Sequence, residues 1–235
     1  MRAVIIAAGE GTRMRPLTHT TPKQLLRVSG KTLLEYVLEV LPPKISEIIM
    51  VVGYKGDHIQ DFLGNTWQGK PVQYVWQEKS LGTAPAMSLA KDLLRGEKQF
   101  LACYADDIHG AEGVAALVRQ QRSCFTVAEV ADPRKFGVIE VDASGKIITF
   151  EEKPTEPKTN LVSSGFFVLP VEILDYVVPA RENGEEYIPD RVERMMKDGY
   201  EFYTERSTRW IPIGYPEDLE KAEEVLGSKK VLKVV

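Results

Sequence analysis

The first half of the chain alternates between apolar runs of strand length and segments in which apolar residues have helical spacing. Four runs predict strands: Ala3–Ala8, Glu47–Val52, Val72–Gln77 and Phe100–Ala105. Four segments predict helices: the stretch from Leu33 to Leu41, Lys55–Leu63, Thr83–Leu94 and Ala111–Gln121. Near-continuous apolar strands that alternate with helices are typical of a mostly parallel sheet covered on both faces. The pattern therefore predicts an α/β fold.

The second half of the chain has a different character. Its predicted strands are Phe125–Val130, Val138–Val141, Ile147–Phe150 and Leu161–Leu169. A polar turn with Gly145 joins the second and third of these, which indicates a hairpin. Helices are predicted at Val171–Val177, Pro189–Lys197 and Tyr215–Leu226. No change in composition marks a linker, so we expect one domain with a lobe built from residues after about 125.

Composition narrows the classes of partner. Hydrophobic residues make up 43% of the 235 residues and the formal net charge is −4, which argues against nucleic-acid or membrane-surface binding. Any anion site must therefore be local. The two cysteines, Cys103 and Cys124, lie in apolar runs and indicate reduced core residues of a cytoplasmic protein. The N-terminal apolar run is too short for a signal peptide, and no stretch is long enough to span a bilayer.

Small residues and cations follow the first strand. The segment reads Ala8-Gly9-Glu10-Gly11-Thr12-Arg13, and Lys23 follows after a short polar stretch. Small residues let a phosphate chain approach the backbone, whose N–H groups can then bind it. A strand end, a glycine loop and nearby cations together indicate a nucleoside triphosphate site. The glycines alone would also fit a turn that needs positive φ, and a surface role is an equal alternative for Arg15.

Residues 7–18 together with Pro22-Lys23 resemble the signature of the nucleoside-diphosphate-sugar pyrophosphorylases, the sugar-1-phosphate nucleotidyltransferases. The resemblance covers nearly the whole chain. It implies a three-layer α/β/α Rossmann-like nucleotide-diphospho-sugar transferase fold, with residues 1–124 as the nucleotide-binding part and residues 125–235 as the sugar-binding lobe. It places six residues against the nucleotide: Ala8, Gly9, Gly11, Thr12, Arg13 and Lys23. Because the chain is short, we expect no C-terminal β-helix domain of the kind that some relatives carry.

A second motif runs from Gln77 to Ala84 and contains Leu81-Gly82-Thr83. A glutamine at a strand end can pair with a base edge through its amide, and a glycine lets the backbone approach that base. The motif resembles the pyrimidine-reading segment of uridylyl- and thymidylyltransferases, which implies that Gln77 and Gly82 read the base and favours UTP or dTTP. Thr83 is expected near the nucleotide and is also a candidate N-cap for a helix starting at Ala84.

Two aspartates, Asp106 and Asp107, follow the strand Phe100–Ala105. They stand at the edge where ligands bind in open α/β sheets. Mg²⁺ takes oxygen ligands and bridges them to phosphates. The resemblance selects Asp106 as the metal ligand and Mg²⁺ as the cofactor, although Ala105 stands where the family has glycine. Asp107 is expected to cap or orient a neighbour, and His109 to be structural.

The third set of motifs comprises Phe136-Gly137 and Glu151-Glu152-Lys153-Pro154. A glutamate beside a lysine can accept hydrogen bonds from sugar hydroxyls while the lysine pairs with a sugar phosphate. By itself such a charged run is usually a solvated hairpin exit. The resemblance implies that the sugar 1-phosphate is contacted by Tyr104, Gly137, Glu152, Lys153 and Ser164. At Ser164 the sequence departs from the family, whose members usually have Asn or Thr before the glycine.

Pro212 is the main departure from the family pattern. It stands in Trp210-Ile211-Pro212-Ile213-Gly214, where many relatives have an aspartate as a second metal ligand. Proline offers no side-chain oxygen, so a metal would be held by Asp106, phosphate oxygens and water, which Mg²⁺ accepts.

The sequence thus predicts an Mg²⁺-dependent reaction in which a sugar 1-phosphate attacks the α-phosphorus of an NTP and pyrophosphate leaves. Four residues are expected to carry the catalysis: Arg13, Lys23, Asp106 and Lys153. One alternative is CTP-dependent transfer to a phosphorylated alcohol such as phosphocholine. Another, supported by Pro212, is a non-catalytic regulatory protein that binds sugar nucleotides. The sugar, the choice between UTP and dTTP, and the existence of a homo-oligomer stay open.

Overall fold

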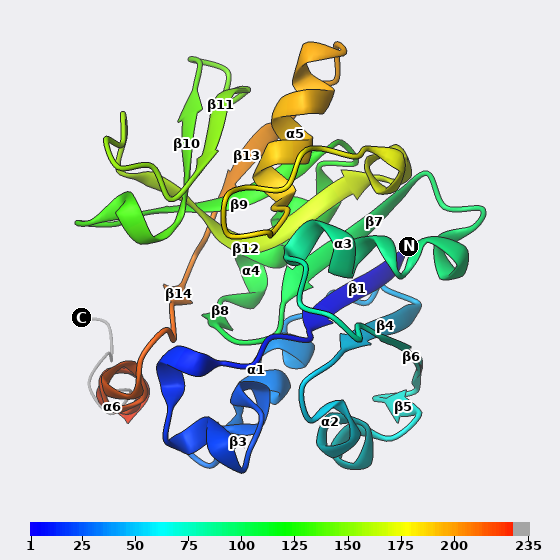
Figure 1. The fold of residues 1–235 in the computed structure, drawn as a ribbon, viewed down its shortest axis with the longest axis vertical. Coiled ribbons are helices and arrows are strands. Elements are labelled where there is room, and N and C mark those ends of the chain that lie inside the picture. Colours follow the sequence, from blue (N-terminus) through cyan, green and yellow to red (C-terminus); the bar gives the residue numbers. More distant parts are fainter. Residues whose placement is uncertain (228–235) are drawn as a thin grey trace, which may run out of the picture.

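Four parallel strands form the centre of the computed structural model, which describes residues 1–227. These strands are β1 (Arg2–Ala7), β4 (Glu47–Val52), β6 (Lys70–Trp76) and β7 (Gln99–Tyr104). Their order across the sheet is β7-β1-β4-β6, and Val4 of β1 lies between Ile49 of β4 and Ala102 of β7 (Figure 1). The short strand β5 (Thr66–Trp67) closes one edge in antiparallel pairing. The four strands predicted in the first half of the chain, and their parallel arrangement, are therefore confirmed.

An antiparallel part extends the sheet beyond β7. The long strand β12 (Leu161–Pro170) pairs with β7, and it also pairs with β9 (Cys124–Glu129) and β10 (Gly137–Val141). The strands β10 and β11 (Ile147–Glu152) form the predicted hairpin. On the outer side of β9 lies β13 (Tyr203–Arg206), in parallel pairing. This part of the molecule carries all the residues predicted to bind sugar except Tyr104.

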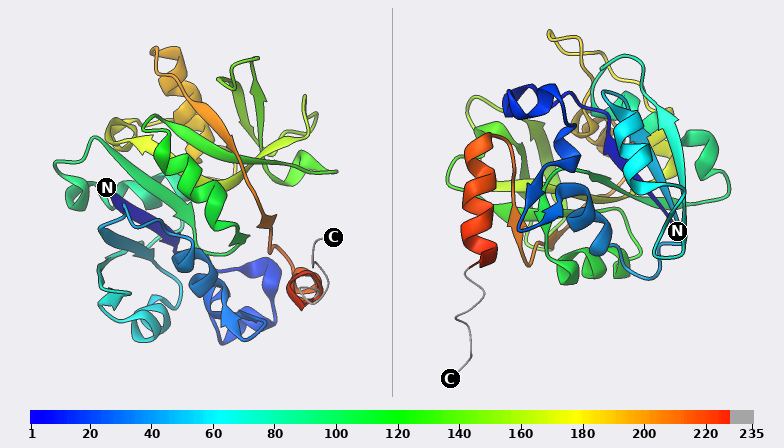
Figure 2. Two further views of the ribbon diagram at one scale, coloured as in Figure 1. Left: turned by 180° about the vertical axis from the view of Figure 1, so that it is seen from behind. Right: turned by 90° about the horizontal axis from the view of Figure 1, so that it is seen from below.

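Helices cover both faces of the sheet, because the side chains of each buried strand alternate between two cores. Val4 and Ile6 pack in a core with α3 (Thr83–Ser88) and α5 (Ile188–Lys197). Ala3 and Ile5 pack in the opposite core with α1 (Leu33–Glu39), α2 (Gly56–Leu63) and α4 (Ala111–Arg119). Figure 2 shows α4 on the rear face, opposite to α3 and α5 in Figure 1. The three-layer α/β/α architecture is thus confirmed.

Short elements complete the frame around the predicted site. The strands β8 (Ile108–His109) and β14 (Trp210–Ile211) pair with each other, as do β2 (Arg27–Val28) and β3 (Lys31–Thr32). The C-terminal helix α6 (Pro216–Gly227) packs through Ala222 on a small core that includes Met14 and Ile213. The Glu223 carboxylate of α6 also accepts hydrogen bonds from the backbone N–H and the hydroxyl of Ser29, which hold the helix against the turn between β2 and β3.

Two predicted helices differ from what the structure shows. The segment Thr83–Leu94 divides into α3 and a separate 3-10 turn, Lys91–Leu94. Backbone N–H groups of Leu89 and Ala90 donate to carbonyls three residues earlier, and the carbonyl of Leu93 accepts from the Arg2 guanidinium. These backbone N–H and C=O groups therefore have hydrogen-bond partners without a continuous α-helix. The segment predicted as a helix from Val171 is a 3-10 turn, Val171–Asp175.

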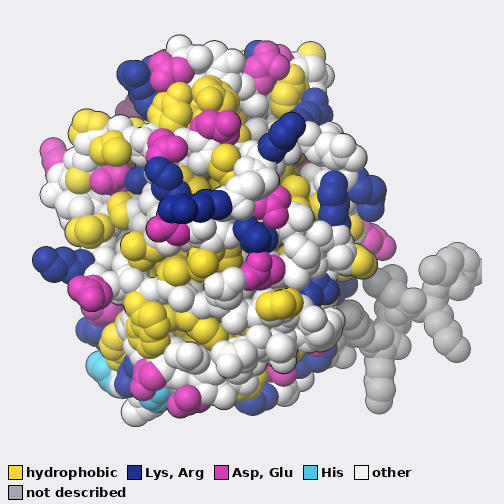
Figure 3. All heavy atoms as spheres, turned by 90° about the vertical axis from the view of Figure 1, so that its right-hand side faces the viewer, with side chains coloured by type: hydrophobic (Ala, Val, Ile, Leu, Met, Phe, Trp, Pro, Cys, Tyr) yellow, Lys and Arg dark blue, Asp and Glu magenta, His cyan; other side chains and the backbone are white. Residues whose placement is uncertain are grey.

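Both cysteines are buried, Cys103 in β7 and Cys124 in β9. Within residues 1–227, no helix has the length and apolar character needed to cross a bilayer. On the face drawn in Figure 3, basic and acidic side chains are interspersed with hydrophobic ones.

Candidate active site

Two adjoining cavities lie at the carboxyl ends of the parallel strands. One has a volume of about 460 Å³ and is lined mainly by the antiparallel part of the fold, and the other has about 310 Å³ and is lined by the glycine loop. All four residues predicted to be catalytic line both cavities: Arg13, Lys23, Asp106 and Lys153. The structure therefore brings these residues, which come from three distant segments of the chain, to the place where the cavities meet.

The remaining predicted residues divide between the cavities as the sequence suggested. The smaller cavity is lined by Ala8, Gly9, Gly11, Thr12, Gln77 and Gly82. The larger cavity is lined by Gly137, Glu152 and Ser164. Thr83 and Tyr104 line both. The geometry thus separates a compartment built by the glycine loop from a second compartment built by the hairpin lobe.

The glycine loop is held in a fixed shape by its own side chains. Gly11 has a φ of +63°, and a Cβ atom there would lie 3.1 Å from both Lys23 Cβ and Thr18 Cγ2, so this position requires glycine. The Thr18 hydroxyl donates to the Gly11 carbonyl at 2.9 Å. Gly9, by contrast, has open space around it, which leaves room for a ligand close to the backbone. Arg15 points away and pairs with Glu10 on the surface.

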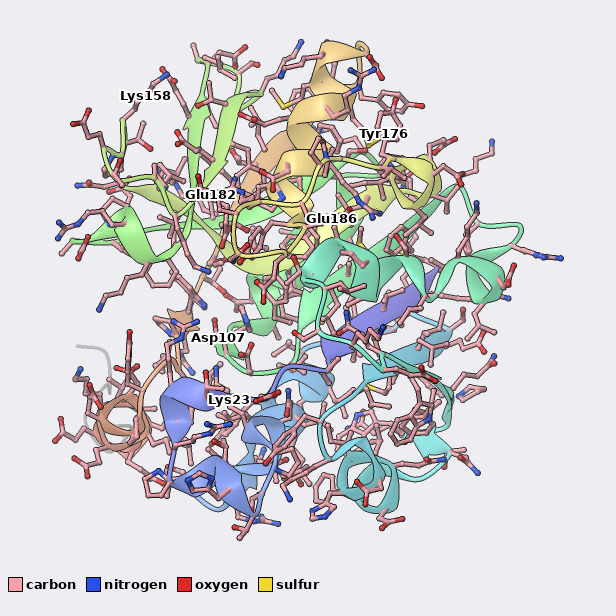
Figure 4. The ribbon with its side chains drawn as sticks, in the orientation of Figure 1. Lys23, Asp107, Lys158, Tyr176, Glu182 and Glu186 are labelled. Carbon is pink, nitrogen blue, oxygen red and sulfur yellow. The ribbon has the colours of Figure 1, made fainter. Side chains whose placement is uncertain are left out.

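Lys23 and Asp106 form an ion pair at the junction of the two cavities. Lys23 Nζ lies 2.5 Å from Asp106 Oδ2, and the two side chains keep 11% and 32% of their surface exposed. Figure 4 shows Lys23 beside the glycine loop, facing the segment that follows β7. The site therefore holds a cation and a carboxylate in contact, and either one can turn to a ligand without a large movement.

The segment expected to read the base is tied to a distant loop. Gly82 has a φ of +103°, and a Cβ atom there would lie 2.2 Å from the carbonyl oxygen of Glu186. Backbone hydrogen bonds join Glu186 to Leu81 and to Ala84. Gln77 Nε2 donates to the Gly82 carbonyl at 3.3 Å. In Figure 4, Glu182 and Glu186 lie on the loop that passes in front of β12 and meets α3.

Thr83 is not the N-cap that the sequence suggested. Gly82 is the N-cap of α3, and no side chain caps this helix. The Thr83 hydroxyl instead accepts a hydrogen bond from Ile188 N at 3.3 Å. The hydroxyl is therefore used to hold the start of α5 beside α3.

Asp107 orients the segment that contains Pro212. Its carboxylate accepts hydrogen bonds from Trp210 Nε1 and from Ile213 N, both at 2.9 Å. Burial and the neighbouring Asp106 carboxylate raise the pKa of Asp107. The orienting role predicted for Asp107 is confirmed.

Of the carboxylates in the described residues, Asp106 alone lines both cavities, which makes it the candidate ligand for a divalent metal. In the described part of the chain, no three His, Cys, Asp or Glu side chains are grouped to hold a metal ion. Asp107 is engaged by Trp210 and Ile213, and Asp218 accepts from Gly214 N and Tyr215 N. Among residues 1–227, Lys23 is the only side-chain partner of Asp106. A single carboxylate with phosphate and water oxygens fits Mg²⁺, which commonly keeps several waters.

His109 is a core residue rather than a ligand candidate. It is 6% exposed, and its ring packs edge-on against Phe166 with a centroid distance of 4.6 Å. Burial lowers the pKa of His109 to about 3, so its ring is neutral at physiological pH. The structural role predicted for this histidine is confirmed.

The hairpin lobe places Glu152 and Lys153 side by side in the larger cavity. Gly137 pairs with Glu152 across β10 and β11, and a Cβ atom on Gly137 would lie 2.7 Å from the Phe150 ring. Lys153 has a φ of +46°, and its N–H donates to the Phe136 carbonyl at 2.9 Å. Lys153 Nζ lies 3.1 Å from Glu152 Oε1. Tyr104 packs edge-on against Phe167 at the floor, and burial raises its pKa.

Ser164 is placed differently from a free sugar-binding hydroxyl. It is 1% exposed, and its Oγ is within hydrogen-bond distance of Thr126 Oγ1 at 2.8 Å and Ser207 Oγ at 2.6 Å. The preceding residue, Ser163, also lines the larger cavity, and its buried hydroxyl has no hydrogen-bond partner within residues 1–227. Within residues 1–227, the hydroxyl without a hydrogen-bond partner is therefore that of Ser163 and not that of Ser164.

Two residues that line the cavities, Tyr187 and Gln24, were not predicted from the sequence. Tyr187 lines both cavities, with Lys153 Nζ 5.2 Å from its ring centroid. Gln24 is 4% exposed and lines the smaller cavity; its Nε2 donates to Ala7 O, and its Oε1 has no partner in the described residues. Gln24 directly follows Lys23, and this adjacency was a signal that could have identified it. Tyr187 had no comparable signal, because its loop contains no recognisable motif.

The fold and the cavity agree with known proteins. A model of the nucleotidyl transferase family matches residues 2–229. The chain belongs to this family. Among solved structures, a protein described as a glucose-1-phosphate thymidylyltransferase from Bacillus anthracis superposes with a TM-score of 0.83 at 27% identity, covering 96% of this chain and 94% of that one.

Curated relatives within the nucleotidyl transferases come from archaea. The low-salt glycan biosynthesis nucleotidyltransferase Agl11 of Haloferax volcanii is 35% identical over 99% of this chain and 68% of its own length. The UTP–glucose-1-phosphate uridylyltransferase AglF of the same organism is 32% identical, with 96% of each chain covered. The bifunctional protein GlmU of Methanococcus maripaludis is 30% identical over the whole of this chain, which spans 56% of that longer protein.

Proposed function

We propose that this nucleotidyltransferase moves a uridylyl or thymidylyl group from UTP or dTTP to a sugar 1-phosphate, with Mg²⁺. The observation that carries the proposal is the convergence of Arg13, Lys23, Asp106 and Lys153 where the two cavities meet. Reacting phosphates need neutralising and positioning groups at one point, with a separate compartment for each substrate. Relatives named as acting on glucose 1-phosphate support the choice of acceptor.

The smaller cavity would take the nucleotide. Open space at Gly9 allows a phosphate chain to approach the backbone. Arg13 and Lys23 would neutralise the triphosphate, while Gln77 and Gly82 would meet the base. The unpaired Gln24 Oε1 is available to accept a hydrogen bond from the nucleotide.

The larger cavity would take the sugar 1-phosphate. Lys153 would pair with its phosphate, and Glu152, Ser163 and the backbone at Gly137 would meet the sugar hydroxyls. Because its nucleophile is already anionic, the acceptor phosphate needs no general base. A phosphate oxygen of the sugar 1-phosphate would attack the α-phosphorus, the bond from that phosphorus to the β-phosphate would break, and pyrophosphate would leave with the electron pair.

Asp106 is the residue that would hold Mg²⁺. When bound, the ion would supply positive charge to the phosphate oxygens as charge shifts during transfer. Lys23, which lies beside Asp106, would contact the triphosphate. We also propose a cytoplasmic protein without nucleic-acid or membrane partners, on the net charge of −4 and the two buried free cysteines.

The experiment is pyrophosphate release from UTP, dTTP, CTP, GTP and ATP, crossed with a panel of sugar 1-phosphates and phosphocholine, with and without EDTA. Release with UTP or dTTP and a hexose 1-phosphate, abolished by EDTA, supports the proposal. Release only with CTP and phosphocholine contradicts the choice of acceptor. Binding of UDP-glucose without release in any combination would indicate a non-catalytic sugar-nucleotide-binding protein.

A further inference from the structure

The three cations of the two cavities named so far, Arg13, Lys23 and Lys153, are not equivalent, and a fourth cation is present. Lys23 pairs with Asp106 and Lys153 pairs with Glu152. Arg13 and one further residue, Lys135, form no ion pair and no side-chain hydrogen bond within residues 1–227. Lys135 lines the larger cavity. Unpaired cations that face a cavity attract an anionic ligand more strongly than cations already neutralised by carboxylates.

One aromatic ring joins these two unpaired cations. Lys135 Nζ lies 5.2 Å from the centroid of the Tyr215 ring, and Arg13 Cζ lies 5.8 Å from the same centroid. Both distances are within the range of a cation–π contact. Arg13 belongs to the glycine loop and Lys135 to the hairpin lobe. Tyr215 therefore holds one cation from each compartment near the boundary between them.

The turn before Lys135 keeps this lysine free. Lys135 ends a short 3-10 turn, Pro133–Lys135, and the nearest acidic residue in sequence is Asp132. Arg134 occupies the Asp132 carboxylate with its Nε at 2.8 Å and its Nη2 at 3.1 Å. The next residue, Phe136, packs edge-on against Trp210 and accepts the N–H of Lys153. The backbone of Lys135 is therefore anchored beside Lys153, while its side chain has no competing carboxylate partner.

We propose that Lys135 binds the phosphate of the acceptor substrate, and that Tyr215 is a positioning residue that holds Lys135 and Arg13 toward the reacting phosphates. The inference rests on the proposed function and adds a second acceptor-phosphate cation to Lys153. It also offers a source of positive charge where, of the described carboxylates, Asp106 alone lines both cavities.

The experiment compares the binding of UDP-glucose and UMP by calorimetry in EDTA. UDP-glucose contains the sugar-side phosphate and the glucose, and UMP lacks both, so the ratio of their dissociation constants reports on contacts to the sugar phosphate half of the ligand. Lys135→Met should weaken UDP-glucose about 10-fold or more and leave UMP within about twofold, because a charge-assisted hydrogen bond is lost. Lys135→Arg should retain most of the affinity. Lys158→Met is the matched control, since Lys158 is an exposed lysine of the same lobe, outside the cavity (Figure 4).

Two variants of Tyr215 test whether its aromatic ring positions Lys135. Tyr215→Phe keeps the ring and should bind UDP-glucose like the wild type, whereas Tyr215→Leu should reproduce the loss seen in Lys135→Met. In turnover, Lys135→Met should raise the KM for the sugar 1-phosphate about 10-fold and change the KM for the nucleotide little. Tyr215→Leu should raise both KM values, because the ring also holds Arg13.

Three outcomes would overturn the inference. Lys135→Met could behave like Lys158→Met, it could weaken UMP as much as UDP-glucose, or Tyr215→Phe could lose as much affinity as Tyr215→Leu. A wild-type protein that binds neither the pair UDP-glucose and UMP nor the pair dTDP-glucose and dTMP contradicts the proposed function itself, and the assignment of Lys135 falls with it. Normal wild-type binding with unaffected variants contradicts the assignment of Lys135 and Tyr215 alone.

Discussion

Lys23 and Asp106 are ion-paired at 2.5 Å although 83 residues separate them in the sequence. Lys23 follows the loop after β1, and Asp106 follows β7, the parallel neighbour of β1. Parallel strands bring their carboxyl ends to one edge, so the two loops meet there. The pair keeps a cation and a carboxylate in place until substrates arrive, and it predicts that each side chain is needed for a different part of the reaction.

Replacing Lys23 removes positive charge from the triphosphate. Lys23→Met should lower kcat by about 100-fold or more while the far-UV circular dichroism stays unchanged, because lost charge stabilisation acts mainly in the transition state. Pyrophosphate release measures the effect. Lys31→Met is the control, since Lys31 is an exposed lysine paired with Glu39. A Lys23→Met enzyme within a few-fold of the wild type would refute the role assigned to Lys23.

Replacing Asp106 removes the carboxylate proposed to hold the metal. Asp106→Asn keeps the shape of the side chain but loses its charge, so we expect Mn²⁺ binding in the presence of UTP to weaken by about 10-fold or more. Electron paramagnetic resonance of free Mn²⁺ measures this without turnover. The control is Asp92→Asn, because Asp92 is 81% exposed and pairs with Arg95 outside the site. Equal Mn²⁺ affinity in Asp106→Asn and the wild type would exclude Asp106 as the ligand.

Gly82 is required both for its positive φ and for the close approach of the Glu186 backbone, and a comparison with Gly96 separates these two causes. Gly82→Ala combines an unfavourable φ of +103° with a Cβ atom 2.2 Å from Glu186 O, whereas Gly96→Ala has a φ of +85° and open space. Both variants carry a backbone cost of roughly 1 kcal/mol. Only Gly82→Ala should lose further stability and raise the KM for the nucleotide. Chemical denaturation and steady-state kinetics measure the two effects, and equal behaviour of both variants would contradict the contact with Glu186.

Buried His109 predicts a specific pH dependence of stability. Its pKa is lowered to about 3 in the folded protein, against about 6.5 when unfolded, so the unfolded state binds the extra proton between these values. The free energy of unfolding should fall as pH decreases through 6.5 toward 3, by up to about 1.4 kcal/mol per pH unit from this group. His109→Gln should remove that part of the slope, and His58→Gln, at an exposed position, should not. If the free energy of unfolding depended on pH equally in the wild type and in His109→Gln, that result would contradict a buried neutral ring at His109.

The sequence predicted the fold well where burial alone dictates the pattern. The strands β1, β4 and β7 lie between two helical layers, so nearly every residue is apolar and each run was identifiable. The glycine loop and the Glu152-Lys153 pair were identifiable because phosphate and sugar chemistry need particular residue types at fixed spacing. The paired strands β8 and β14 were missed, since two residues each are too few to show a period.

The missed parts of the site depend on contacts between distant segments. The Thr83 hydroxyl is engaged by Ile188 N instead of capping α3, and the loop around Glu186 determines the need for Gly82. The orientation of Ser164 follows from the register of β12 against β9, where the pairing shifts between Ser163 and Phe167. Lys135 carries no motif at all, and its significance follows from the ring of Tyr215 placed 80 positions later.

The central claim is that an acceptor phosphate attacks the α-phosphorus where Arg13, Lys23, Asp106 and Lys153 converge. The most direct measurement uses glucose 1-phosphate labelled with ¹⁸O in its three non-bridging phosphate oxygens, with UTP and Mg²⁺, and mass spectrometry of both products. The account predicts that UDP-glucose retains all three labelled oxygens and that pyrophosphate carries none. Label in pyrophosphate, or in free inorganic phosphate without UDP-glucose, would contradict it.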